Sequence, residues 1–62
     1  MNDLVKLQKR GFYLSLSLFP DGHYWMTIAR LDENWTIHGT AKGPLEAVQW
    51  FMEMAREYEE GT

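Results

Sequence analysis

The chain has 62 residues, no cysteine and a net charge of −3 at neutral pH. A domain of this size buries only about 60 % of its unfolded surface, and without cysteine it cannot add disulfides for stability. The sequence has no apolar run long enough to cross a membrane and no recognisable signal peptide, so we expect a cytoplasmic protein.

The charge is unevenly distributed along the chain. Residues 1–31 carry a net charge of +2 and residues 32–62 a net charge of −5. Nucleic-acid affinity depends on neutralising several phosphates, and the only basic cluster consists of Lys6, Lys9 and Arg10. The charge pattern therefore disfavours a protein that reads duplex DNA.

Residues 1–11 are mostly polar, with Leu4, Val5 and Leu7 scattered among them. Chain ends fray unless they are anchored, so we expect a weakly ordered N-terminal arm followed by a single domain over residues 12–62. The alternative is an arm that packs on the sheet edge or covers one of its apolar patches.

A β-hairpin is predicted over residues 12–31. Residues 12–19 alternate between two faces, with Leu14, Leu16 and Leu18 on the apolar one. The Pro20-Asp21-Gly22 segment is typical of a type I turn with a bulge at glycine. This turn pairs Leu18 with Tyr24, Leu16 with Met26 and Leu14 with Ile28.

A third strand is predicted over residues 35–40, and its register depends on the length of the preceding turn. A two- or four-residue loop directs Trp35 and Ile37 to the core face, whereas a three-residue loop with left-handed Asn34 directs them to the opposite face. We favour the core placement, because a strand that contributes nothing to so small a core is a poor solution.

Residues 44–60 predict a helix that begins after Gly43, with Pro44 in its first turn, and ends before Gly61. The predicted fold class is therefore α+β: a three-stranded antiparallel meander with one C-terminal helix on one face. The apolar residues of this helix span about 220° of arc, where a core-facing stripe needs about 100°. We assign the core to eight residues: Leu14, Leu16, Met26, Ile28, Val48, Phe51, Met52 and Ala55.

The remaining apolar residues predict interaction surfaces, because Trp, Tyr and Met are enriched in interface cores. Trp50, Met54 and Ala47 lie on one flank of the helix, and Tyr13, Phe19 and Trp25 on the far sheet face. We take Tyr13, Trp25, Trp50 and Met54 as the partner-binding or dimer residues, with Trp50 and Met54 near the two-fold axis of a homodimer. Glu53, Glu57, Glu59 and Glu60 form a predicted acidic strip.

No pattern of catalytic or metal-binding residues stands out. Two histidines, His23 and His38, fall short of the ligand set of a structural zinc site. Ser15 and Ser17 lie in the middle of a strand, where a nucleophile lacks the strained turn it needs. We predict no enzymatic activity, no metal and no cofactor.

Several segments resemble the N-terminal domain of HicB-like antitoxins: Asp21-Gly22-His23-Tyr24-Trp25, the stretch from Gly39 to Gly43, Leu45-Glu46-Ala47 and Tyr58-Glu59-Glu60. The resemblance implies a partial RNase H-like β-β-β-α arrangement that binds a small toxin and self-associates. The family's Pro-Asp-Leu-Pro-Gly-Cys element is replaced here by Leu31-Asp32-Glu33-Asn34.

The function expected from these features is that of a small protein-binding module. It would inhibit or neutralise a protein target, such as a toxin or a nucleic-acid-binding defence protein, by surface occlusion or acidic mimicry. Its size and acidity are also similar to phage anti-defence inhibitors, anti-CRISPR proteins among them. The alternative is a nucleic-acid-binding accessory protein that uses the basic arm and the sheet aromatics.

Overall fold

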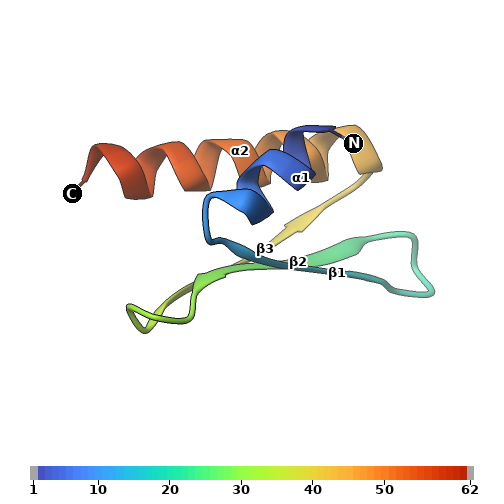
Figure 1. Ribbon diagram of the computed structural model, residues 1–62. Coiled ribbons are helices and arrows are strands. Elements are labelled where there is room, and N and C mark those ends of the chain that lie inside the picture. Colours follow the sequence, from blue (N-terminus) through green and yellow to red (C-terminus); the bar gives the residue numbers. More distant parts are fainter. Residues whose placement is uncertain (1, 62) are drawn as a thin grey trace.

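The computed structural model describes residues 2–61. Its elements are α1 (Asn2–Lys9), β1 (Tyr13–Leu18), β2 (Tyr24–Arg30), β3 (Trp35–Ala41) and α2 (Pro44–Glu60). The strands form one antiparallel sheet in the order β1-β2-β3, and both helices lie on the same side of it (Figure 1). The predicted α+β meander with a C-terminal helix is confirmed, and α1 is an additional element.

The first hairpin has the predicted register. Leu14 pairs with Ile28, Leu16 with Met26 and Leu18 with Tyr24. The Phe19 N–H donates to the His23 carbonyl at 2.9 Å, and Gly22 adopts a φ of +90°, in the region that favours glycine. The local chemistry of the turn thus sets the pairing of the whole hairpin.

The third strand lies in the favoured core register. Ile28 pairs with Ile37 and Arg30 with Trp35, which leaves a four-residue connection over residues 31–34. Asn34 nevertheless has a φ of +55°, the left-handed conformation that the sequence analysis associates with the opposite placement. Asparagine tolerates this conformation, and the length of the loop keeps Trp35 and Ile37 on the helix side.

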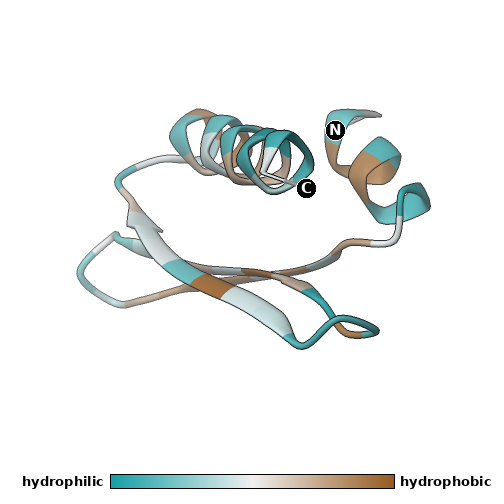
Figure 2. Ribbon diagram, turned by 90° about the vertical axis from the view of Figure 1, so that its left-hand side faces the viewer, coloured by the Kyte–Doolittle hydropathy of each residue, from teal (hydrophilic) through white to brown (hydrophobic). Residues whose placement is uncertain are grey.

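The N-terminal segment differs from the expected weakly ordered arm. Residues 2–9 form α1, and residue 1 lies outside the described residues. Leu4 and Leu7 are three residues apart and therefore share one helix face. Leu7 is only 3 % exposed and lies in the same core cluster as Phe12. Figure 2 shows α1 beside α2 above the sheet, so α1 leaves the opposite sheet face uncovered.

The expected core composition needs a correction on α2 and β1. Leu16 and Met52 are 51 % and 43 % exposed, whereas Ala47, expected on an outer flank, is only 2 % exposed. Trp50 and Met54 pack against the core cluster. The physical reason is that α2 packs on β2 and β3, which turns its Ala47–Trp50–Met54 side inward and leaves the distal part of β1 uncovered.

Candidate protein-interaction surface

The sheet face that points away from both helices, called the open face below, consists of alternate residues of the three strands. Strand pairing arranges nine of them in three cross-strand rows: Tyr13–Ala29–Thr36, Ser15–Thr27–His38 and Ser17–Trp25–Thr40. Residues directly opposite each other in an antiparallel sheet project to the same side. These nine residues therefore share one face, on which Ala29 is only 2 % exposed, and Phe19 extends the face beyond the end of β1.

Three rings form a continuous stack on the open face. The Phe19 and Trp25 ring centroids are 6.4 Å apart, and those of Trp25 and His38 are 5.8 Å apart, with an interplanar angle of 25° in both pairs. The Nδ1 atom of His38 lies 2.9 Å from the Thr27 hydroxyl oxygen, and this hydrogen bond orients the imidazole. The stack remains accessible, because Trp25 is 41 % exposed.

The open face carries no lysine, arginine, aspartate or glutamate at any of these positions, although the chain contains 6 basic and 9 acidic residues. A sheet face in water normally carries polar and charged side chains. Aromatic rings interspersed with hydroxyl groups are instead typical of protein-binding surfaces, because they give large contacts at a low cost in side-chain entropy. The composition of this face therefore favours contact with another protein.

The four predicted contact residues do not form one site. Tyr13 and Trp25 both lie on the open face, in rows at opposite ends of β1. Trp50 and Met54 lie on the other side of the sheet and pack against the core. The Trp50 ring also meets the Phe51 ring edge-on, with centroids 5.4 Å apart. The sheet thus separates the two predicted pairs.

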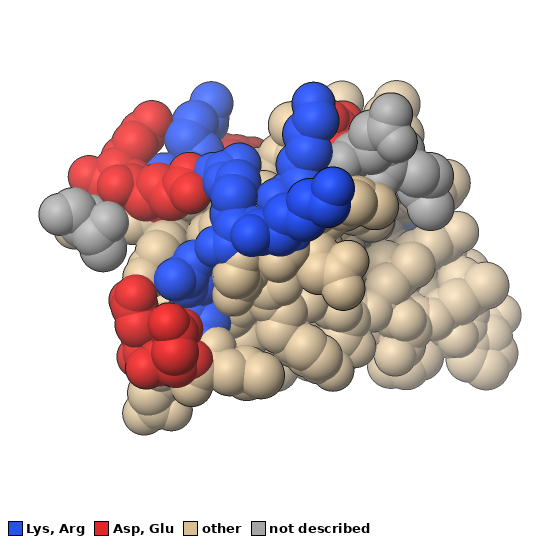
Figure 3. Space-filling view, in the orientation of Figure 1, with Lys and Arg blue, Asp and Glu red and all other residues tan. Residues whose placement is uncertain are grey.

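The predicted acidic strip lies on α2, and one of its members is paired within the chain. Glu53, Glu57 and Glu60 are exposed on α2. Glu59 is also exposed, and it forms an ion pair with Arg10, the residue that follows α1. Figure 3 shows acidic side chains beside the basic side chains of this part of the molecule. All four carboxylates belong to the helix layer, away from the open face.

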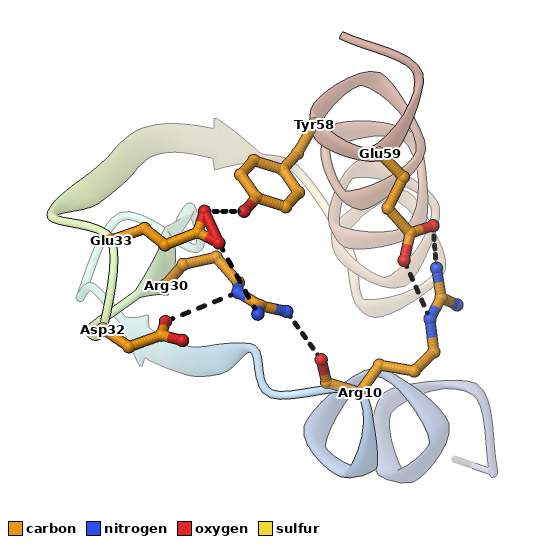
Figure 4. Close-up of polar contacts among 6 residues, drawn as sticks. All are labelled: Arg10, Arg30, Asp32, Glu33, Tyr58 and Glu59. Carbon is orange, nitrogen blue, oxygen red and sulfur yellow. Dashed lines mark hydrogen bonds and ion pairs between the residues drawn. The ribbon is translucent and has the colours of Figure 1, made fainter. Parts of the chain in front are cut away.

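Sequence reasoning missed a polar cluster that joins both helices to the β2–β3 loop (Figure 4). Arg30 lies at its centre with 19 % of its side chain exposed. Its Nη1 donates to the Arg10 carbonyl at 2.6 Å, and its guanidinium lies 5.1 Å from the Phe12 ring centroid. Asp32 and Glu33 lie close to the same guanidinium, at 3.7 and 3.9 Å. The available signal was that Arg30 continues the core-facing alternation of β2.

Tyr58 completes this cluster. Its hydroxyl donates a hydrogen bond to Glu33, and its ring lies 5.4 Å below the Arg30 guanidinium. The hydrogen bond to Glu33, with a smaller contribution from desolvation, raises the pKa of Tyr58 above its ordinary value. Both partners of each contact come from distant parts of the sequence, so the cluster holds the end of α2 against the loop.

At the first hairpin turn, one carboxylate is stabilised in its charged form. The His23 backbone N–H donates to Asp21 Oδ1 at 3.0 Å, and His23 Nδ1 lies 3.1 Å from Oδ2. These contacts, the backbone hydrogen bond first, lower the pKa of Asp21. The arrangement is an Asx-type turn contact and accounts for the position of His23 without a ligand.

Within residues 2–61, no three His, Asp or Glu side chains come together in a way that would hold a metal ion. Neither helix in that range combines the length and apolar character needed to cross a bilayer. No family model matches the chain, and no curated protein or solved structure is significantly similar to it. The comparisons therefore assign no family, and the resemblance to HicB-like antitoxins stays an expectation from the sequence.

Proposed function

We propose that this chain is a small, non-enzymatic protein-binding module that inhibits or neutralises a partner protein by covering part of its surface. The observation that carries the proposal is the open face, a complete sheet surface without a charged residue and with an exposed Phe19–Trp25–His38 stack. An antitoxin-like or phage anti-defence inhibitor, as expected from the sequence, is one form of this function.

The energetics of binding favour such a surface. Burying Trp25 and Phe19 in a partner removes large apolar areas from water. No charge on the open face has to be desolvated, which removes the penalty that often offsets the gain of an interfacial ion pair. The partner that fits best has an uncharged surface with an apolar pocket for Trp25, because tryptophan anchors of this kind often dominate binding energy.

The geometry gives less support to the nucleic-acid alternative. Binding of single strands combines aromatic stacking with a basic groove that follows the phosphates. Here the aromatic stack is on the open face, whereas Lys6 and Lys9 belong to α1, and Arg10 directly follows it, on the other side of the sheet. Arg10 is also paired with Glu59. Stacking and phosphate contacts would therefore fall on different surfaces.

Acidic mimicry is a separate possibility within the same function class. The exposed Glu53, Glu57 and Glu60 belong to the helix layer, so one flat partner surface cannot contact them and the open face at once. We assign recognition to the open face. Charge reversal on α2, described in the Discussion, tests the acidic strip independently.

Affinity capture with matched variants tests the proposal. The wild-type chain, a Trp25→Ser chain and a Leu45→Ser chain are immobilised and exposed to extract of the organism that encodes the protein. Leu45 is the control, because it is exposed on α2 rather than on the sheet. We expect a protein retained by wild type and Leu45→Ser but lost with Trp25→Ser, followed by binding of the purified pair in calorimetry. Equal retention by all three chains would contradict the assignment, and steeply salt-dependent binding of a DNA or RNA oligonucleotide would favour the alternative.

A further inference from the structure

The β1 strand forms an uncovered edge of the sheet. The strand order β1-β2-β3 leaves one side of β1 without a neighbouring strand among the described residues. Exposed edges are aggregation hazards that proteins usually protect with charges, prolines or bulges. Residues 11–19 contain no charged residue and no proline, so this edge has none of the usual protection along its whole length.

The backbone groups that β1 presents outward can be identified from the hairpin. The Phe19 N–H and C=O both bond within the hairpin, to His23 and Gly22. Because these groups alternate in direction along an extended strand, the odd-numbered residues of β1 direct them to β2 and the even-numbered residues direct them outward. The outward set is Leu14, Leu16 and Leu18, each with one donor and one acceptor.

The leucine side chains of the same three residues lie on the helix side of the sheet, at a place the helices leave open. Leu16 is 51 % and Leu18 64 % exposed. The apolar surface continues onto α1, where Leu4 and Val5 line a hollow together with Leu14. In Figure 3 the surface below α1 and over the hairpin shows no charged side chain. Backbone bonding capacity and apolar area thus coincide on one edge.

We propose that β1 pairs antiparallel with β1 of a second copy of this chain, with the two-fold axis at Leu16, to form a continuous six-stranded sheet. In this register Leu16 faces Leu16 of the second copy, and Leu14 faces Leu18. Every outward N–H and C=O of the three leucines then has a partner. The proposal is independent of the function assigned to the open face.

The sequence of the strand explains why the occupant is a second copy. A two-fold axis perpendicular to the sheet keeps the helices of both copies on one side. Each residue must therefore pair with a residue whose side chain points to the same side of the sheet. A register centred on Leu16 meets this condition, and because the Leu-Ser-Leu-Ser-Leu run of residues 14–18 reads the same in both directions, it also sets leucine opposite leucine and serine opposite serine. Since the run is uncharged, self-pairing brings no like charges together.

Neighbouring registers are less favourable. Centring the pair on Ser17 sets Leu14 opposite Pro20, which has no N–H to donate. Centring it on Ser15 sets Leu18 opposite Phe12, which precedes β1 and is buried in the core. The register at Leu16 also brings Tyr13 opposite Phe19 of the second copy on the open face, where aromatic cross-strand pairs are favourable.

The other edge of the sheet lacks these properties. The helix side of β3 is already covered, because α2 packs on it and Trp50 lies over Gly39. Self-pairing of β3 about His38 would set two imidazoles opposite each other and would place a glycine within the ladder, which weakens a strand. Of the two edges, β1 is therefore the one suited to self-association.

Charge placed on the proposed axis tests the pairing. Light scattering should give about twice the 7.3 kDa chain mass for the wild type. Leu16→Lys should be monomeric, because two ammonium groups would meet at the axis. Thr36→Lys is the matched control, with the same charge in the opposite edge strand, and should remain dimeric. Mixing the Leu16→Lys and Leu16→Glu chains should restore a 1:1 heterodimer detectable by native mass spectrometry.

Amide hydrogen exchange distinguishes this dimer from any other. We expect concentration-dependent protection of the Leu14, Leu16 and Leu18 amides, which point outward in the single chain. A wild-type monomer at millimolar concentration would overturn the proposal. A dimer in which these amides exchange freely would also overturn it, as would a dimer that Leu16→Lys leaves intact, because either dimer would use another surface. A Leu16→Lys chain that is unfolded by circular dichroism would leave the amide protection of wild type as the deciding measurement.

Discussion

The indole of Trp50 lies against the backbone of Gly39, so close that a Cβ at residue 39 would come within 2.5 Å of Trp50 Cε2. Gly39 pairs with Met26 in the middle of the sheet, and Trp50 lies midway along α2. The absence of a side chain at this one strand position therefore allows α2 to approach β3 closely, and it sets which side of the helix faces inward.

Gly39→Ala should destabilise the fold, because the indole must move to accommodate the methyl group. Overpacking of this kind typically costs about 1–3 kcal/mol. Urea unfolding followed by tryptophan fluorescence measures the loss. Gly43→Ser is the control, because a Cβ at residue 43 would meet no atom within 4 Å and serine is a good helix N-cap. Equal stability of Gly39→Ala and wild type would mean that α2 does not rest on β3 as described.

Tyr58 should make the fold sensitive to alkaline pH. The hydrogen bond to Glu33 raises the pKa of Tyr58 in the folded state above the ordinary value of 10.0. As the pH rises, the unfolded chain therefore loses the Tyr58 hydroxyl proton before the folded chain does. The contribution of this hydrogen bond to folding stability is fully present below pH 10 and is lost as the pH rises through the raised pKa. In Tyr58→Phe, we expect lower stability at neutral pH and a shallower decline in alkali. Urea midpoints measured between about pH 8 and pH 11 give the comparison, and parallel curves for the two chains would contradict the predicted role.

The hairpin was predictable because its determinants are local. Pro20, Asp21 and Gly22 specify a turn within three residues, and the alternation of Leu14, Leu16 and Leu18 specifies the face. The core placement of β3 was favoured on another ground, that each strand must contribute to so small a core, and the pairing of Ile28 with Ile37 confirms it. Where one short segment contains both the turn residues and the apolar alternation of the adjoining strand, its structure can be predicted from the sequence of that segment.

Other features depend on contacts that no short segment encodes. Helix α1 has eight residues, a length that is unstable without tertiary packing, and Leu7 provides that packing only once β1 and α2 are in place. The wide apolar arc of α2 is compatible with several rotations of the helix about its own axis. The space at Gly39, which admits the Trp50 ring, favours one of these rotations. The Arg30–Tyr58 cluster joins residues far apart in sequence. Consequently, Tyr13 and Trp25 could be assigned to the far sheet face from the sequence, whereas the inward packing of Trp50 and Met54 could not.

Gly22→Val should damage the hairpin turn. Gly22 has a φ of +90°, and a β-branched residue in a left-handed conformation costs on the order of 1–2 kcal/mol. Gly22→Asn is the matched variant, because asparagine tolerates positive φ and should cost less. Thermal unfolding of both chains measures the difference. Since nothing lies within 4 Å of the Cβ position, steric contact cannot explain a loss, and identical midpoints for the two variants would argue against a left-handed residue here.

Charge reversal on α2 separates the open face from the acidic strip. Glu53 and Glu57 are exposed and belong to the helix layer, so Glu53→Lys with Glu57→Lys should change the fold little. If the open face carries recognition, the double variant should bind the captured partner within about threefold of wild type, a difference below 1 kcal/mol. Trp25→Ser should then raise the dissociation rate at least tenfold.

If the acidic strip carries recognition, the double reversal should instead slow association, and the defect should shrink with added salt because exposed charges are screened. Surface plasmon resonance at two salt concentrations distinguishes these outcomes, with Leu45→Ser as the control for a change on α2 that alters no charge. Loss of binding with the double reversal and none with Trp25→Ser would move the recognition surface from the sheet to α2.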